Sequence, residues 1–308
     1  MTTQAAELRV AAVTPSARAM RFISKSPVHA GLIGIALIWL IPTIGLLVNS
    51  FRSEQDVSAS GWWSALFPPW NLSLDNYASV LGEQGIGDAF VNSLFITIPS
   101  VIIPILVAAF AAYAFSWMSF PGRNLLFVAV VGLLVVPLQT TFIPILKLYA
   151  GISIHFGPVN IDTLNGEFLA VWLAHTGYGL PFAIYLLRNF MGGLPKEVFE
   201  SAAIDGASPV VAFLRLALPM SVPAIAALVI FQFLFVWNDL LVALVYIGST
   251  NAANSPLTIS IANLVTSLGG NWQLLGAAAF MSMALPLLVF ASLQRYFVRG
   301  ITGGAVKG

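Results

Sequence analysis

The sequence predicts an all-α, polytopic membrane protein with six membrane-spanning helices. Of its 308 residues, 58% are hydrophobic and only 8% are charged, whereas a typical soluble domain carries about 25% charged residues. Apolar runs of about 20 residues recur along the chain, and a helix of that length crosses the hydrocarbon core of a bilayer. The few basic residues are also distributed unevenly between the segments that connect these runs.

Six apolar stretches have the length and composition of a membrane-spanning helix. We expect the spans near residues 29–50, 89–116, 125–148, 168–190, 220–247 and 273–297. Prolines inside several of these stretches predict kinked helices, which are tolerated where neighbouring helices satisfy the freed carbonyl groups. The first run is too long for a secretory signal and no small-residue cleavage site follows it, so we expect a retained anchor.

The positions of the basic residues predict the orientation of the chain. Segments on the cytoplasmic side of a membrane protein carry most of its lysines and arginines. With both termini inside, eleven of the thirteen basic residues face the cytoplasm, and only Arg52 and Lys147 lie outside. We therefore expect a cytoplasmic tail over residues 1–27, a six-helix domain over 28–299 and a cytoplasmic tail over 300–308. The first thirty residues are polar and aperiodic, so we expect them to form a loose tail.

A polar segment, residues 191–219, separates the fourth and fifth expected spans, and we call it the elbow. Pro195 fits the first position of a short helix, where its missing N–H costs nothing. Gly206 ends that helix, because glycine adopts the left-handed conformation at little cost. Ser208-Pro209 then fits the cap and first position of a second helix, which we expect to close at Leu218-Pro219.

The elbow also has a small apolar surface that admits two interpretations. The residues that we expect to form it are Phe199, Ala202, Ala203 and Ala207. The elbow is either an ordinary loop that packs on its own bundle, or a surface that fits a cleft in another protein.

The order of residues in the elbow closely resembles the EAA loop of ABC importer permeases. The matching run is Glu200-Ser201-Ala202-Ala203-Ile204-Asp205-Gly206-Ala207, followed by Leu218-Pro219, and Ser201 replaces one of the family's alanines. The resemblance implies the type I ABC importer permease fold, in which this loop is the coupling helix that docks onto a cytoplasmic ATPase subunit. The residues that it assigns to this coupling are Glu200, Ala202, Ala203, Asp205, Gly206, Ala207 and Pro219.

Two further matches narrow the family to carbohydrate importers. Trp237-Asn238-Asp239 looks like the Trp-Asn-acid motif of their permeases, and residues 294–308 closely resemble the end of MalG-type subunits of maltose-class importers. With Asn92-Ser93 in the second span, the resemblance covers roughly residues 77–308. It implies an importer for a sugar, for example an α-glucoside, in the cytoplasmic membrane of a bacterium or archaeon. A polyol or glycerol phosphate is an alternative solute.

The resemblance also implies partners and contacts. The partners are a second homologous permease, two ATPase subunits, an extracytoplasmic solute-binding protein and membrane lipid, with no nucleic acid. The C-terminal tail is expected to reach the ATPase dimer through Gly303, Gly304 and Lys307. The loop between the last two spans is expected to reach the binding protein through Gly269, Gly270, Asn271 and Trp272.

Asp239 is a carboxylate inside the fifth expected span, where a charge costs roughly 2.5–3.5 kcal/mol at mid-membrane. We expect it to line the solute pathway together with Gln232, Trp237 and Asn238. One alternative is a hydrogen-bond anchor between helices. The other is a proton site, which would make the chain a secondary transporter.

The sequence holds few groups that could catalyse a reaction. It has no Walker-type phosphate loop and no cysteine, and its three histidines form no ligand pattern. We therefore expect a transporter subunit rather than an enzyme, with no cofactor or metal bound by this chain and with ATP and Mg²⁺ on the partner ATPase.

Overall fold

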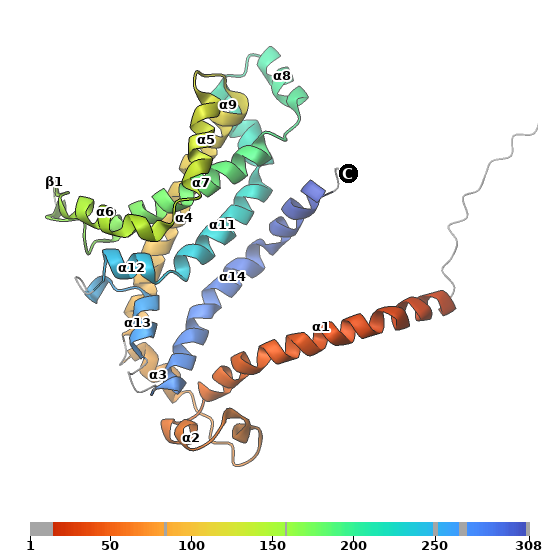
Figure 1. Ribbon diagram of the computed structural model, residues 1–308, viewed down its shortest axis with the longest axis vertical. Helices are drawn as coiled ribbons and strands as arrows, with labels where there is room; N and C mark the ends of the chain where they lie inside the picture. Colours follow the sequence, from red (N-terminus) through yellow and green to blue (C-terminus); the bar gives the residue numbers. More distant parts are fainter. Residues whose placement is uncertain (1–14, 83–84, 158, 249–251, 265–269, 306–308) are drawn as a thin grey trace, which may run out of the picture.

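The computed structural model describes residues 15–82, 85–157, 159–248, 252–264 and 270–305. Its centre is a bundle of four long helices: α4 (Ile86–Trp117), α7 (Phe168–Met191), α11 (Val222–Trp237) and α14 (Trp272–Ala305) (Figure 1). Helix α4 packs extensively against α7, and α11 packs against both α4 and α14. Small and aliphatic side chains such as Ala108, Ala112, Leu187 and Leu228 are fully buried where these helices meet. The predicted all-α fold is confirmed.

Shorter elements connect and cover these helices. They are α2 (Glu54–Ala59), a 3₁₀ turn (Trp62–Leu66), α3 (Asp75–Gly82), α5 (Arg123–Leu133), α6 (Leu138–Ala150), β1 (Ile154–Phe156), β2 (Val159–Ile161), α8 (Lys196–Ile204), α9 (Pro209–Ala212), a π-helical turn (Phe213–Ala217), α10 (Leu218–Met220), α12 (Leu241–Tyr246), a second 3₁₀ turn (Ala252–Asn254) and α13 (Leu257–Leu264). The two strands pair antiparallel, with His155 opposite Asn160.

Four of the six expected spans are single helices in the described part of the chain. They cover Pro27–Asn49, Ile86–Trp117, Phe168–Met191 and Trp272–Gln294. Their lengths and mean hydropathies, between 1.2 and 2.5, suffice to cross a membrane.

The other two expected spans are broken helices. The third bends by 95° between α5 and α6, where Pro137 lacks an N–H and disfavours the helical conformation of the preceding residue. The fifth bends by 70° between Pro209–Met220 and Val222–Trp237. It also ends at Trp237 rather than near residue 247, because the chain leaves the helix at Asn238 and restarts as α12. The bend at Pro137 agrees with the kinks predicted from prolines inside the spans, whereas a continuous fifth span over residues 220–247 was a wrong prediction.

Two helices extend further than the sequence suggested. Helix α1 (Pro15–Asn49) begins at Pro15, so the expected loose tail is wrong from that residue on. Helix α14 continues to Ala305, so the glycine-rich tail over 300–308 is helical as far as it is described. In both cases a helix already formed is extended one residue at a time, which costs less than starting a new one.

The long helix α1 contacts the bundle only near its C-terminal end and then diverges from it (Figure 1). Gly276 of α14 permits this contact, because a Cβ there would lie 2.9 Å from the carbonyl oxygen of Leu46. Further towards its N-terminus α1 is exposed, with Trp39 at 79%. Lipid or another protein must cover this surface in a membrane.

The segment between the first two spans folds around one buried arginine. Arg52 is 3% exposed, and its guanidinium donates to the carbonyl oxygens of Asp56 and Ser60 and to the hydroxyl of Ser64. Asn76 donates to the carbonyl oxygen of Arg52. Helices α2 and α3 therefore form a folded cap at the end of the bundle opposite the elbow (Figure 1).

Candidate functional site: the elbow and the break in the fifth span

The elbow contains the two predicted short helices. Gly206 adopts the left-handed conformation with φ of +83°, and the hydroxyl of Ser208 accepts a hydrogen bond from the N–H of Val211, which caps α9. Pro195 is the N-cap of α8 rather than its first helical residue. The turn predicted from the Gly206 and Ser208-Pro209 signals is confirmed.

We expected the second helix of the elbow to close at Leu218-Pro219, but it does not. It passes through the π-helical turn and α10 to Met220 before the bend at Ser221. Pro219 has no N–H to donate to the preceding turn, and the π-helical turn that comes just before it is a single turn within the helical path, the usual form of a π-helix. The elbow is thus joined to α11 by a nearly continuous helical path.

Phe199 points into the protein and not toward a partner. Its side chain is 8% exposed and stacks on Trp117 of α4, with ring centroids 3.9 Å apart and planes inclined by 19°. The indole N–H of Trp117 in turn donates to the carbonyl oxygen of Met191 at 3.0 Å. Of the two interpretations of the elbow surface, Phe199 therefore fits the one in which the elbow packs on its own bundle, because a large ring gains more by filling this gap between the helices.

The open face of the elbow consists of other residues. Ile204 is 87% exposed and Val210 is 65% exposed, and Glu200, Ala203 and Asp205 are also exposed. Ile204 is about 140° around the helix from Phe199, so α8 presents one apolar residue inward and another outward. The helical periodicity of the sequence predicts that Phe199 and Ile204 lie on different faces of α8. It does not show which of these two residues is turned toward the bundle.

A shallow hollow lies in the elbow between α4 and α8. It has a volume of about 350 Å³ and is lined by Tyr113, Trp117, Lys196, Phe199, Glu200, Ala203, Ala207, Pro209 and Ala212. Among the predicted coupling residues, Glu200, Ala203 and Ala207 meet here, while Ala202 is half-buried and Pro219 is exposed further along the path to α11.

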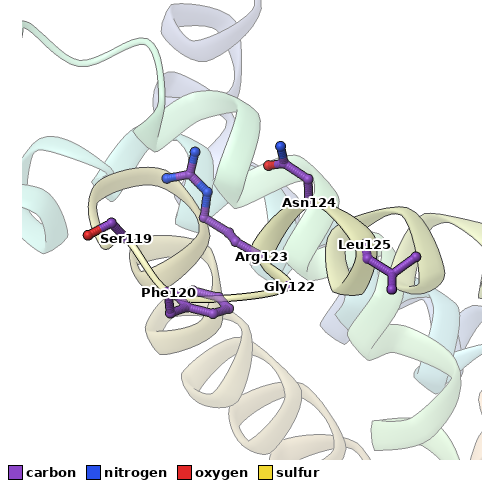
Figure 2. Close-up of a pocket in the computed structure, with 6 residues that line it drawn as sticks. All are labelled: Ser119, Phe120, Gly122, Arg123, Asn124 and Leu125. Carbon is purple, nitrogen blue, oxygen red and sulfur yellow. The ribbon is translucent and has the colours of Figure 1, made fainter.

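A second hollow of about 330 Å³ lies in the turn between α4 and α5. Gly122 adopts a left-handed conformation there with φ of +78°, and Arg123 donates to the carbonyl oxygen of Met118 at 3.0 Å. Figure 2 shows that the side chains of Arg123 and Asn124 lie on one side of the chain and that of Leu125 on the other. The turn therefore adds a positive charge to the end of the bundle that carries the elbow.

The four predicted pathway residues do not share one environment. Trp237 is 2% exposed, and its indole N–H donates to the carbonyl oxygen of Ser282 in α14. Asn238 is exposed and donates to the carbonyl oxygen of Leu234. Gln232 is buried and donates to the carbonyl oxygen of Ser100 at 3.3 Å. Gln232 lies against Gly179 of α7, and Asp239 lies beside His175 of the same helix.

Asp239 connects three elements at the end of α11. Its Oδ2 accepts hydrogen bonds from the N–H groups of Val242 at 2.9 Å and Ala243 at 3.2 Å, which caps the start of α12. The same oxygen lies 3.8 Å from Nε2 of the buried His175 on α7, and the hydroxyl of Thr258 on α13 donates to the carbonyl oxygen of Asp239. Sequence reasoning did not pair His175 with Asp239, because the two residues are 64 positions apart.

The connection between the last two spans folds back against the bundle. The N–H of Leu257 donates to the hydroxyl of the buried Ser93 at 2.8 Å, and the amide of Asn92 donates to the carbonyl oxygens of Ala253 and Ser255. The Asn92-Ser93 pair therefore holds α13 on α4.

Those of the remaining predicted contact residues that the structure describes lie at or near the two ends of α14. Trp272 is 48% exposed and Asn271 has a left-handed backbone with φ of 65°, while Gly269 and Lys307 lie outside the described residues. Gly270 belongs to the described part of the same connection, and Gly303 and Gly304 lie in the last turns of α14. The contacts predicted for these residues with partner proteins remain predictions.

Comparison with known proteins agrees with this architecture. Residues 89–303 match the model of the family described as binding-protein-dependent transport system inner membrane component. The chain is 54% identical over 293 residues to the osmoprotective compounds uptake permease protein GgtD of Synechocystis, covering 94% of this chain and 95% of that protein. It is 53% identical to the alpha-glucoside transport system permease protein AglG of Rhizobium meliloti, over 85% of this chain and 67% of that protein.

A solved structure has the same fold. A chain of a bacterial ABC transporter involved in the import of the acidic polysaccharide alginate superposes with a TM-score of 0.73, over 92% of this chain and 98% of that chain, at 20% identity. The relatives are membrane permease subunits and not enzymes. The chain therefore belongs to the family of inner-membrane components of binding-protein-dependent transport systems.

Proposed function

We propose that this chain is a permease subunit of an ATP-driven importer that moves an α-glucoside or a similar sugar into the cell. The observation that carries the choice of solute is the 53% identity to an alpha-glucoside permease. Relatives named for arabinooligosaccharides and diacetylchitobiose, at 32% and 30% identity, support a carbohydrate more broadly. The similarity to the relative named for osmoprotective compounds supports a polyol as the alternative solute.

The proposed complex contains a second homologous permease, two ATPase subunits and an extracytoplasmic solute-binding protein. The exposed flank of α1 supports a partner within the membrane, because its contacts with the bundle are confined to one end. The exposed Ile204 and the hollow beside it support an ATPase contact at the elbow. ATP and Mg²⁺ belong to the ATPase, and the excess of basic residues near the elbow and both termini supports a cytoplasmic location for them.

Two routes connect the elbow with the helices of the bundle. Phe199 stacks on Trp117, whose indole is hydrogen-bonded to Met191, so α8 is connected to both α4 and α7. The π-helical turn and α10 connect α9 to α11. When ATP closes the ATPase dimer and moves the elbow, these packed contacts transmit the displacement to three central helices. The helices then open alternately to the two sides of the membrane.

The first test separates this importer from a secondary transporter. We expect the reconstituted complex to take up an α-glucoside only with ATP and the loaded binding protein, and a protonophore to leave uptake unchanged. Asp239→Asn keeps the shape and an acceptor oxygen for the α12 cap but removes the charge, so at least about half of the uptake is expected to remain at pH 6, 7 and 8. Collapse of uptake on adding the protonophore at constant ATP would contradict the importer.

A second test concerns the end of α14. Deletion of residues 301–308 touches no apolar span, so insertion and topology are expected to persist. The stimulation of ATP hydrolysis by loaded binding protein is expected to fall at least severalfold, because a proposed link to the ATPase dimer is removed. The measurement is ATPase activity with and without loaded binding protein. An unchanged stimulation ratio would show that these residues make no such contact.

A further inference from the structure

A small groove lined by aromatic rings lies between α7 and α11. It has a volume of about 300 Å³ and is lined by Tyr178, Gly179, Phe182, Phe231, Gln232 and Phe235. The rings of Phe182, Phe231 and Phe235 are 40–47% exposed, although both helices belong to the central bundle. Its volume is at the lower end of the range for small-molecule sites, which leaves room for about one sugar ring.

The shape of this groove depends on Gly179. A Cβ at this position would lie 2.5 Å from Nε2 of Gln232, so any larger residue would displace the amide or separate the two helices. Gln232 is 5% exposed, and its Nε2 is held by the carbonyl oxygen of Ser100. The amide therefore sits at the floor of the groove in a fixed orientation.

Polar groups continue along the same face of α7 and α11. The ring of His175 packs edge-on against Phe235, with centroids 6.0 Å apart, and Asp239 follows one helical turn beyond Phe235, 3.8 Å from His175. On the opposite side the hydroxyl of Tyr178 is hydrogen-bonded to Tyr246 at 2.9 Å. A helix face turned to lipid rarely carries an amide, an imidazole and a carboxylate, since such groups face a bundle interior or a water-filled cavity.

Rings and amides arranged in this way match the surface of a pyranose. The face of an aromatic ring carries partial negative charge, and the C–H groups on one side of a sugar ring are weakly positive and apolar. The hydroxyl groups around the rim of the sugar need hydrogen-bonding partners once water is removed, because an unpaired buried hydroxyl group is destabilising. The groove offers several rings beside one fixed amide.

We propose that the groove between α7 and α11 is a carbohydrate subsite of this subunit. The ring of Phe235 stacks on the apolar face of one sugar ring, and the amide of Gln232 bonds one of its hydroxyl groups. Tyr178, which is held by its own hydrogen bond, forms a rigid wall that lowers the entropy cost of binding. The inference rests on the proposed sugar import and adds that this permease contacts the sugar itself.

The test compares two aromatic positions of nearly equal exposure. Phe235→Leu removes the ring from the groove and keeps an apolar side chain, whereas Phe290→Leu does the same on α14, outside the groove, where Phe290 is 42% exposed against 44% for Phe235. Loss of one ring stack predicts a roughly three- to tenfold lower α-glucoside uptake for Phe235→Leu. Phe235→Tyr keeps the ring and should retain uptake, and Phe290→Leu should resemble the wild type.

Two further readouts on the same proteoliposomes distinguish the possible outcomes. The yield of assembled complex and the ATPase activity stimulated by loaded binding protein are both expected to persist in Phe235→Leu. Loss of assembly would make the groove an interface between permeases, and unchanged uptake would make it a lipid-facing surface, so either result overturns the subsite. Absence of α-glucoside uptake by the wild-type complex would instead refute the proposed function.

Discussion

Gly206→Val is expected to abolish solute uptake while the complex still inserts and at least partly assembles. Gly206 has φ of +83°, and a Cβ added to it would meet no atom within 4 Å, so the effect comes from backbone conformation and not from a clash. The left-handed conformation costs an L-residue roughly 1–2 kcal/mol, and a β-branched residue more. The turn between α8 and α9 should therefore open and separate the ATPase contact from the bundle. The measurement is uptake together with ATP hydrolysis in proteoliposomes.

Two companion variants test this reason. Asparagine tolerates the left-handed conformation better than valine, so Gly206→Asn should retain an intermediate level of uptake. Gly132→Val is the matched control, because Gly132 also has open space around it but lies within α5 with an ordinary helical backbone. Uptake at the wild-type level in Gly206→Val would exclude a coupling role for the elbow.

Phe199→Ala is expected to produce the second large loss, through detachment of α8 from α4. Truncation of a buried phenylalanine costs roughly 3–5 kcal/mol, and Phe199 supplies the stacked contact with Trp117. The cost should fall on the elbow alone, because the central helices are held by other contacts. We expect uptake to decrease at least tenfold and limited proteolysis within residues 195–209 to accelerate.

Ile204→Ala provides the contrast on the same helix. Ile204 is 87% exposed, so its truncation should leave the proteolysis pattern of the isolated permease unchanged. It should instead reduce the amount of ATPase subunit that copurifies with the permease, because an exposed apolar side chain at an interface gains its stabilisation only from the partner. The assignment of the two faces of α8 fails if Phe199→Ala leaves proteolysis unaltered, or if Ile204→Ala accelerates it.

Local signals in the sequence determined much of this protein. The four continuous spans follow from apolar length, and the expected Phe168–Phe190 span differs from α7 by a single residue. The elbow follows from Gly206 and Ser208-Pro209, whose conformational preferences act within a few residues and need no distant partner. The order of residues around Glu200 was sufficient to identify the permease family, which the family match confirms.

Contacts between distant segments decided the rest, and only the tertiary structure shows them. Phe199 and Ile204 have similar apolar character, and the contact of Phe199 with Trp117 of α4 shows which of them is buried. Asp239 pairs with His175 across two helices, and Ser93 folds α13 onto α4 across 164 positions of sequence. Each of these contacts requires that two surfaces meet with complementary shape and polarity, and a one-dimensional pattern carries no information on which surfaces those are.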